Sequence, residues 1–416
     1  MNLAIASLLP RAAAVAAGSL LPVNVGLISI ALAFALGPLT GALSVREVVA
    51  GFPSSLFLTL VGVTLLFSQA RANGTLDRVA ALALRLARGR AGWVPVIFFA
   101  LALVFSSIGP GNIAAVALLA PVAMATAGRA GVSAFLMAVM VCTGANAGAF
   151  SPFAPTGIIA NELMAGIGLE GLEWRNYFNA LVAQSFVGFA GYLLFGGAGL
   201  LRARTAVAAA DGAAPVERFG RAQWLTIAVI SALILGVVLL DVDVMAGAFA
   251  GAVMLGLARA ADEKAALAGM PWGTVLMVCG VTVLIGVVDR VGGMDLLTTL
   301  ISGLSSEATI TGVMALLTGV ISVYSSSSAV VLPAFLPTIP GLIEKLGGGD
   351  ALAIASSINV GAHLVDVSPL STLGALCIAN AAAGVDRKRL FNQMLAWGLS
   401  MCLVGAVVCL VFFGLL

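Results

Sequence analysis

Small polar residues and glycines interrupt four segments of the chain that are otherwise strongly apolar. Two of these interruptions are FSSIGPGNIA (105–114) and the serine run at 325–328, and the other two lie at 144–157 and 361–374. Backbone carbonyls that leave a helix, together with Ser, Thr and Asn side chains, supply the oxygen ligands that hard cations such as sodium prefer. The four interruptions therefore predict two cation sites, each built from one polar turn and one interrupted helix.

The ligands expected for these two sites are hydroxyl, amide and backbone carbonyl oxygens. The first predicted sodium site consists of Ser106, Ser107, Asn112 and the carbonyls near Gly148. The second consists of Ser325, Ser326, Ser328 and the carbonyls near Val365. Close packing of membrane helices through small residues is the alternative explanation, although four consecutive serines exceed what packing requires.

A site for a small anion is expected beside the cations. An anion usually meets Arg or Lys, but in the layout below these residues lie in loops and interfaces, with only Arg11 unassigned. Helix N-termini at the interruptions offer free N–H groups and the positive end of the helix dipole. Bound sodium and nearby polar side chains would complete the site, and the candidates are Asn112, Ser328, Ser151, Thr156, Ser368, Ser371 and Thr372.

One ionisable pair lies deep in a predicted span. Asp366 is the only acidic residue placed there, and His363, the only histidine, precedes it by three positions. At helical spacing the two side chains could face the same way. Ionisable groups inside a membrane are functional by default, and histidine titrates near neutral pH. The pair is a candidate for proton coupling or direct cation binding, or else a locally satisfied pair that stabilises an interrupted helix.

The composition is that of an integral membrane protein. Hydrophobic residues make up 61% of the chain and charged residues 9%, and the mean hydropathy is +1.14. Soluble domains average about 25% charged residues. The five cysteines lack metal-site spacing, and HExxH and GxSxG motifs are absent from the sequence. We therefore expect no enzyme, no cofactor other than sodium as a coupling ion, and no nucleic-acid partner.

The chain contains two similar halves. Residues 51–77 align without gaps on 269–295 with nine identities at an offset of 218. Two further blocks follow in the same order at nearly the same offset: 111–121 on 327–337, and 144–157 on 361–374. An odd number of predicted crossings separates corresponding elements, which indicates an inverted repeat. Secondary transporters typically have this architecture, with the binding site at the repeat interface.

The expected layout has about nine or ten spans, with residues 3–20 as the uncertain one. The first repeat, 1–201, would contain scaffold helices within 1–70, an interfacial arm at 72–90, a re-entrant hairpin at 93–127, a broken helix at 131–167 and a helix at 174–201. After a cytoplasmic linker at 202–221, the second repeat, 222–416, would contain scaffold helices at 222–288, an arm at 289–306, a hairpin at 308–347, a broken helix at 350–380 and a helix at 391–414. Only with both hairpins re-entrant do most Lys and Arg residues fall on the cytoplasmic side, as the positive-inside rule requires.

At these motifs the chain resembles the ion transporter superfamily, and within it the divalent anion/sodium symporters and the malonate-type dicarboxylate carriers. PVNVGLISIALAFALG (22–37) is similar to the malonate-type carriers in particular. Hairpin tips of the superfamily carry a Ser-Asn-Thr signature. Here the first tip keeps Asn112 and the second reads Ser327-Ser328-Ala329, so both depart from it. The resemblance implies an elevator movement of a transport domain against a homodimeric scaffold. We expect the chain to lie in the lipid bilayer of a bacterial inner membrane.

The sequence as a whole predicts an all-α polytopic membrane protein of the inverted-repeat, elevator type. The predicted function is sodium-coupled symport of a small di-anion, such as a C3–C4 dicarboxylate. A proton-coupled anion carrier or cation/proton antiporter that uses Asp366 and His363 is the alternative. An intramembrane enzyme is the less favoured third reading.

Overall fold

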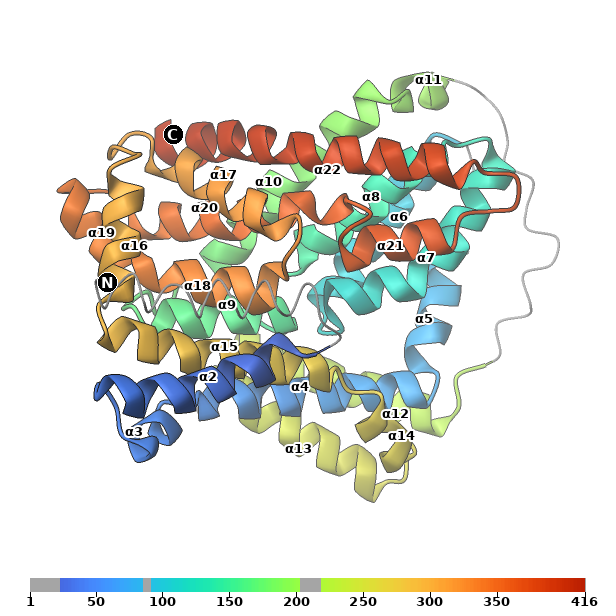
Figure 1. Ribbon diagram of the computed structural model, residues 1–416. Coiled ribbons are helices and arrows are strands. Elements are labelled where there is room, and N and C mark those ends of the chain that lie inside the picture. Colours follow the sequence, from blue (N-terminus) through green and yellow to red (C-terminus); the bar gives the residue numbers. More distant parts are fainter. Residues whose placement is uncertain (1–22, 85–90, 203–217, 416) are drawn as a thin grey trace.

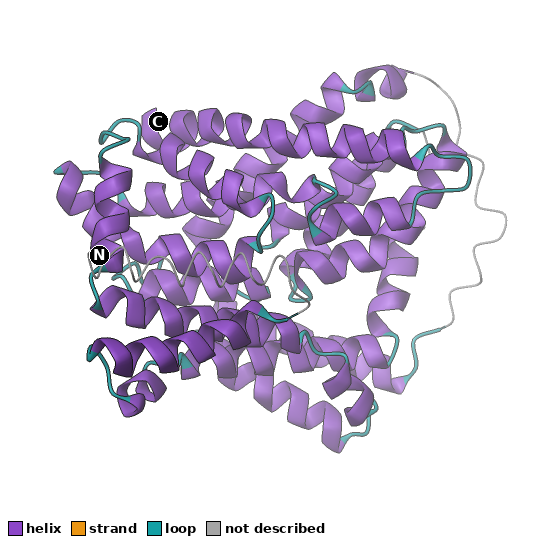
Figure 2. Cartoon of the chain, in the orientation of Figure 1, coloured by secondary structure: helices purple, strands orange, loops and turns teal. Residues whose placement is uncertain are grey.

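The computed structural model describes residues 23–84, 91–202 and 218–415. Within these ranges the chain forms helices joined by turns, and none of these residues is in a β-strand (Figure 2). The all-α prediction is confirmed for this part of the chain. The predicted span at 3–20, the end of the arm at 72–90 and most of the linker at 202–221 lie outside the described residues.

Among the described residues, eight helical segments are long and apolar enough to cross a bilayer: Val45–Ala72, Gly111–Ala130, Glu173–Leu194, Arg221–Leu240, Trp272–Arg290, Ser327–Leu346, Ala351–Ala379 and Arg387–Leu415. A helix needs about 20 apolar residues for this, and so the chain is an integral membrane protein. Two of the eight, Gly111–Ala130 and Ser327–Leu346, are the second arms of the predicted hairpins. Each has 20 residues, which is enough to cross by length alone.

The described part of the first half contains ten helices. They are α2 (Val25–Thr40), α3 (Val45–Ala50), α4 (Ser54–Ala72), α5 (Thr75–Leu84), α6 (Trp93–Ser107), α7 (Gly111–Ala130), α8 (Ala134–Gly148), α9 (Pro155–Ala165), α10 (Glu173–Leu194) and α11 (Gly197–Arg202).

The second half repeats this order after α12 (Arg221–Leu240). It continues with α13 (Val244–Leu257), α14 (Glu263–Ala268), α15 (Trp272–Arg290), α16 (Gly293–Ser302), α17 (Ile310–Ser322), the π-helix η2 (Ser327–Val331), α18 (Leu332–Phe335), η3 (Leu336–Thr338), α19 (Ile339–Leu346), α20 (Ala351–Leu364), η4 (Val365–Val367), α21 (Thr372–Ala379), α22 (Arg387–Cys409) and η5 (Leu410–Leu415).

Corresponding helices follow the offset found by aligning the two halves. Helices α4 and α15 each have 19 residues and begin at residues 54 and 272. Helices α5 and α16 begin at residues 75 and 293. Helices α3 and α14 each have six residues and begin at residues 45 and 263. The repeated sequence blocks therefore encode repeated helices of the same length.

The described helices fall into two groups (Figure 1). Helices α2, α3, α4 and α12 to α15 lie together at the bottom of the view, where α2 packs on α15 and α4 on α13. The group above them contains α6 to α10 and α17 to α22, in which α8 packs against α6, α7 and α10, and α17 against α20 and α22. The lower group corresponds to the segments predicted as scaffold helices.

Two helices of the upper group are interrupted where the sequence analysis expected it. Helix α8 ends at Gly148 and α9 begins at Pro155, and we call residues 149–154 the first break. Helix α20 ends at Leu364 and α21 begins at Thr372, and we call residues 365–371 the second break. Both breaks contain Ser-Pro, and the residue before a proline is disfavoured in the helical conformation.

The predicted single helix over 174–201 ends earlier than expected. Helix α10 stops at Leu194, and Gly196 has φ of +96°, which a continuing right-handed helix does not permit. The short helix α11 follows. The adjacent glycines at 196 and 197 favour this change of direction more strongly than the apolar pattern favours one long helix.

Helices α2 and α15 are in direct backbone contact through glycines. A Cβ atom on Gly280 would lie 2.2 Å from the carbonyl oxygen of Gly26, and a Cβ atom on Gly26 would lie 2.2 Å from the carbonyl oxygen of Leu276. Small residues permit such close approach in membrane helices, where dispersion contacts stabilise the packing.

We expect Gly280→Ala to destabilise the protein by about 1–3 kcal/mol, the usual cost of overpacking a tight contact. The melting temperature of the purified protein in detergent measures this loss. Gly286→Ala in the same helix is the matched control, because a Cβ atom at that position would have no neighbour within 4 Å apart from the adjoining backbone of its own helix. Equal melting temperatures for the two variants would contradict the observed contact.

Candidate functional site

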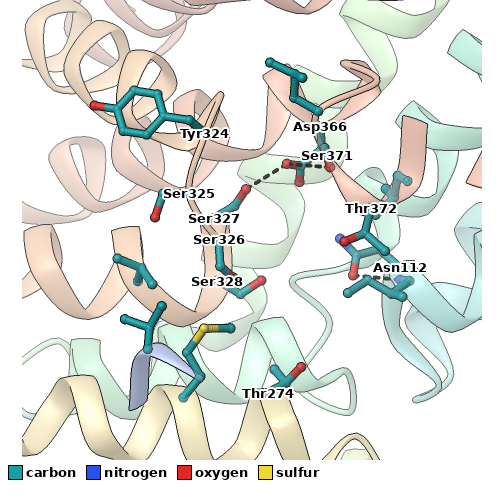
Figure 3. Close-up of a pocket in the computed structure, with 16 residues that line it drawn as sticks. Asn112, Thr274, Tyr324, Ser325, Ser326, Ser327, Ser328, Asp366, Ser371 and Thr372 are labelled. Carbon is teal, nitrogen blue, oxygen red and sulfur yellow. Dashed lines mark hydrogen bonds between the residues drawn. The ribbon is translucent and has the colours of Figure 1, made fainter. Parts of the chain in front are cut away.

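A pocket of about 320 Å³ lies where the two halves of the chain meet (Figure 3). Its lining comes from the start of α7, the segment that precedes and opens η2, the second break with the start of α21, and the lower-group helices α2 and α15. The residues are Val25, Asn112, Ile113, Thr274, Met277, Tyr324, Ser325, Ser326, Ser327, Ser328, Val330, Asp366, Leu370, Ser371, Thr372 and Leu373. Seven of the residues singled out by the sequence analysis are among them: Asn112, Ser325, Ser326, Ser328, Asp366, Ser371 and Thr372.

Hydroxyl groups dominate the polar part of this lining. Asp366 contributes the only carboxylate, and none of the described residues that line the pocket is Lys, Arg or His. An anion in this pocket would therefore meet one carboxylate and no compensating basic side chain. Accompanying cations would lower the cost of binding an anion here, because buried charge without a partner is costly.

The turn between α6 and α7, which we call the first turn (108–110), depends on two glycines that flank Pro110. Gly109 has φ of +136° and Gly111 has φ of +80°, both in the region that other residues rarely adopt. A side chain at Gly109 would also collide with the ring of Phe67, which lies 1.8 Å from the ideal Cβ position. The Gly-Pro-Gly sequence therefore starts α7 in a direction that brings its second residue, Asn112, to the pocket.

The turn between α17 and η2, which we call the second turn (323–326), is made of Val323, Tyr324 and the first two serines of the run. The hydroxyl of Ser326 accepts a hydrogen bond from the backbone N–H of Ala329 at 3.2 Å and so caps the next helix. That helix begins as the π-helix η2. Single π-turns occur frequently at functional sites, and this one directs Ser327 and Ser328 to the pocket.

Asp366 is held by a chain of serine hydroxyls. Ser327 donates a hydrogen bond to Oδ1 of Asp366 at 2.7 Å, and the Ser322 hydroxyl lies 2.6 Å from that of Ser327. Since Ser327 donates to the carboxylate, Ser322 donates to Ser327. The hydroxyl of Ser371 reaches the same oxygen at 3.4 Å (Figure 3). These donors compensate for the burial of the carboxylate, whose residue is 6% exposed.

His363 and Asp366 have separate partners. Nδ1 of His363 lies 2.9 Å from the carbonyl oxygen of Asn359, which can only accept, so Nδ1 carries the proton. In the neutral ring Nε2 then accepts from the hydroxyl of Ser328 at 3.4 Å. His363 is fully buried and does not line the pocket, whereas Asp366 does. The two side chains therefore meet different serines of the same run.

Of the first predicted sodium site, Asn112 lines the pocket, whereas Ser106, Ser107 and Gly148 do not. An ideal Cβ atom on Gly148 would lie 2.7 Å from the hydroxyl of Ser107 and 2.9 Å from Cβ of Ser106, so the three residues are in contact. Ser107 donates to the carbonyl of Leu103 at 2.8 Å. Ser106 is fully buried, and its hydroxyl has no hydrogen-bond partner among the described residues. An unpartnered buried oxygen at this position fits a cation ligand.

Three of the remaining predicted residues make local contacts, and Thr156 makes a contact that is distant in sequence. The hydroxyl of Ser151 accepts from the N–H of Phe153 at 3.4 Å, and that of Ser368 accepts from Leu370 at 3.3 Å, so both stabilise the breaks. The carbonyl of Val365 accepts from the N–H of Ser368 at 2.8 Å. The hydroxyl of Thr156, in the first turn of α9, lies 3.2 Å from that of Ser328 and so connects the helix after the first break to the serine run.

Four residues that the sequence analysis did not select belong to this site. Asn146 accepts a hydrogen bond from Nδ2 of Asn112 at 2.8 Å, and Ser322 and Ser327 hold Asp366. The alignment of the two halves offered a signal for Asn146, since it aligns with His363. Thr274, which lines the pocket from α15, carried no such signal.

The first part of the chain is similar to a family model, and the chain as a whole is similar in fold to a solved transporter structure. The family model described as "Dicarboxylate carrier protein MatC N-terminus" matches residues 1–149. The crystal structure of the YdaH transporter of Alcanivorax borkumensis, described as revealing an unusual topology, is similar with a TM-score of 0.57 at 17% sequence identity. This likeness covers 94% of this chain and 96% of that chain. None of the curated proteins compared with the chain matches it.

Proposed function

We propose that this chain, a transporter of a dicarboxylate carrier family rather than an enzyme, performs sodium-coupled symport of a small dicarboxylate across a bacterial inner membrane. The observation that carries the proposal is the lining of the pocket, which offers many hydroxyl oxygens, one carboxylate and no basic side chain among its described residues. A C3–C4 dianion can enter such a pocket only together with cations.

The repulsion between a bound dianion and the Asp366 carboxylate can be estimated from Coulomb's law. Two like charges 4 Å apart repel by about 4 kcal/mol at an effective dielectric constant of 20. A dianion beside an ionised Asp366 therefore binds poorly until cations neutralise the site. By linkage, cations that improve anion binding are themselves bound more tightly by the same factor when the anion is present. Coupling then arises without a titrating base.

Two sodium sites, one from each half of the chain, would hold these cations. Ser106, Ser107, Asn112 and the Gly148 carbonyl would form the first, for which the unpartnered hydroxyl of Ser106 is the structural support. Ser325, Ser326, Ser328 and the Val365 carbonyl would form the second. The substrate carboxylates would lie between them, against the N–H groups and hydroxyls at the start of α21, with Ser371 and Thr372.

An inverted repeat with two re-entrant hairpins is part of the proposal. In its support, α6 with α7 and α17 with α18 and α19 lie toward opposite ends of the molecule, and the turn of each pair precedes pocket residues (Figure 1). Helices α2 to α4 and α12 to α15 would form the homodimeric scaffold, and the upper group would move against it as an elevator. The linker at 202–221 would face the cytoplasm.

A second candidate function follows from the contacts of Asp366. This carboxylate lines the pocket and ends a chain of hydroxyl donors that runs from Ser322 through Ser327. A proton on Asp366 would remove the repulsion that sodium removes in the first proposal. The chain would then be a proton-coupled dicarboxylate carrier or a cation/proton antiporter, with His363 holding Ser328 in place.

Uptake of radiolabelled malonate and succinate into proteoliposomes tests both candidates. A tenfold gradient stores about 1.4 kcal/mol per sodium ion, so two sodium ions per dianion permit up to about 100-fold accumulation. We expect accumulation with an inward sodium gradient and none with an equal potassium gradient. Accumulation that requires only a proton gradient would replace the first candidate by the second. No uptake of either acid under any gradient would contradict the proposed substrates.

A further inference from the structure

Two hydrogen-bonded pairs occupy equivalent places in the two halves of the chain. In the first half, Asn112 of α7 donates to Oδ1 of Asn146 in α8 at 2.8 Å. In the second half, the hydroxyl of Ser328 in η2 lies 3.4 Å from Nε2 of His363 in α20. The sequence alignment of the halves places Asn112 on Ser328 and Asn146 on His363. Each half therefore holds its pocket residue through one polar side chain of the adjacent interrupted helix.

A direct hydrogen bond joins the two pairs. Nδ2 of Asn146 donates to the backbone carbonyl of His363 at 2.8 Å, across 217 positions of sequence. This contact makes a continuous polar connection from Asn112 through Asn146 and His363 to Ser328. The carbonyl of His363 lies in the last turn of α20, which ends one residue later at Leu364. It accepts from the N–H of Val365 and, as a carbonyl oxygen can accept two hydrogen bonds, from Asn146 as well.

Asn146 and His363 do not contact a ligand in the pocket. Both are fully buried, and neither lines the pocket, whereas Asn112 and Ser328 do. The amide of Asn146 is engaged on both sides, by Asn112 and by the carbonyl of His363. The ring of His363 is engaged at both nitrogens, by Asn359 and Ser328. Their polar groups hold other residues in place.

We propose that Asn146 and His363 are positioning residues that couple the two halves of the binding site. A ligand that orders Asn112 fixes the amide of Asn146, which fixes the end of α20 and with it the His363 ring that holds Ser328. Occupancy of one half thereby favours the bound arrangement of the other. This inference rests on the proposed transport function for the identity of the ligands, and it names the residues that make their binding cooperative.

A double-mutant cycle between Asn112 and Ser328 tests the coupling. The malonate Kd of purified protein in sodium buffer is measured by titration calorimetry for the parent, Asn112→Ala, Ser328→Ala and the double variant. No direct hydrogen bond joins Asn112 and Ser328, so we expect non-additivity of about tenfold to arise through Asn146. This factor corresponds to the loss of roughly one buried hydrogen bond, about 1.4 kcal/mol.

The same Asn112/Ser328 cycle, repeated in proteins that also carry a substitution at Asn146, His363 or Thr143, shows which residues carry the coupling. In Asn146→Ala the two substitutions are expected to become additive. In the His363→Gln background most of the coupling between Asn112 and Ser328 should remain, because the glutamine amide oxygen can still accept from Ser328. In the His363→Ala background this coupling should be lost. Thr143→Ala is the matched control, because Thr143 lies one turn earlier on α8, is equally buried and bonds only its own helix at the Val139 carbonyl. This background should keep the full coupling.

The outcomes separate this inference from the proposed function. Additivity in the parent, or undiminished coupling in Asn146→Ala, overturns the positioning role. If neither malonate nor succinate binds the parent, the substrate proposal is wrong. The cycle is then evaluated on melting temperatures, where coupling that disappears in Asn146→Ala supports the inference and additivity overturns it. Sodium coupling is judged independently, from the uptake experiment.

Discussion

Asp366→Asn is expected to abolish cation-driven accumulation of the dicarboxylate, with an uptake rate at least about 100-fold below that of the parent protein. Interactions of a buried charge with close partners are worth roughly 3 kcal/mol or more, which corresponds to this factor. The substitution preserves the size of the side chain and an oxygen that can accept from Ser327 at the observed 2.7 Å. The change therefore removes charge and keeps the packing.

The measurement is initial uptake into proteoliposomes under a sodium gradient and, separately, under a proton gradient. The parent protein shows which of the two gradients drives uptake. If Asp366→Asn loses uptake under that gradient, the coupling cation acts through Asp366. Asp241→Asn is the matched control, because Asp241 is an exposed residue that ends α12 with φ of +52°, a conformation that asparagine also tolerates. Undiminished accumulation in Asp366→Asn, with normal yield and melting temperature, would show that the carboxylate charge is not used.

Ser371→Ala and Ser327→Ala compare the two hydroxyl groups that reach Asp366. Its hydroxyl reaches Oδ1 of Asp366 at 3.4 Å, near the limit for a hydrogen bond, whereas Ser327 donates at 2.7 Å. We therefore expect Ser327→Ala to reduce coupled uptake more than Ser371→Ala does. The reverse order would indicate that Ser371 acts mainly on the substrate.

Gly157→Ala and Gly374→Ala are expected to have the second largest effect, a loss of transport accompanied by a lower melting temperature. A Cβ atom on Gly157 would lie 2.0 Å from the carbonyl oxygen of Ser151, and one on Gly374 would lie 2.1 Å from that of Ser368. In both breaks the helix that follows folds back against the Ser-Pro segment. A methyl group cannot fit there unless the break opens, so overpacking of about 1–3 kcal/mol acts directly on the site.

Transport and melting temperature are measured together for these glycine variants. Gly166→Ala is the matched control for Gly157, since it ends the same helix and its Cβ atom would make only ordinary contacts, at 3.5 Å and beyond. We expect Gly166→Ala to transport normally. Parent-like transport by Gly157→Ala would mean that the close approach in the first break is not required for function.

These glycines illustrate how far the sequence alone predicts the fold. The composition and the apolar segments predicted an all-α membrane protein, because a bilayer requires long apolar segments and helices that satisfy their own backbone. The Ser-Pro pairs and glycines predicted both breaks, because their effects on the backbone are local. The alignment of the halves predicted which helices correspond, since α4 and α15 begin at the aligned residues 54 and 272.

The sequence alone also placed the polar turns and breaks near one another, and Asn112, Asp366 and the serine run do line one pocket. It did not separate residues that line the pocket from residues that support them. Ser151 and Ser368 belong to the same motifs as Thr156 and Ser371, yet their hydroxyls accept from local backbone N–H groups. Spacing along a chain predicts which backbone is irregular, but not which direction each side chain takes within it.

What only the tertiary structure decided is which distant side chains meet. The contact between Asn146 and the carbonyl of His363 spans 217 positions, and Thr274 reaches the pocket from a helix whose apolar pattern predicts scaffold packing. Such contacts depend on how helices cross and on how closely glycines let them approach. The local pattern of a helix determines the face that it buries, whereas the partner of that face is determined by the packing of the whole chain.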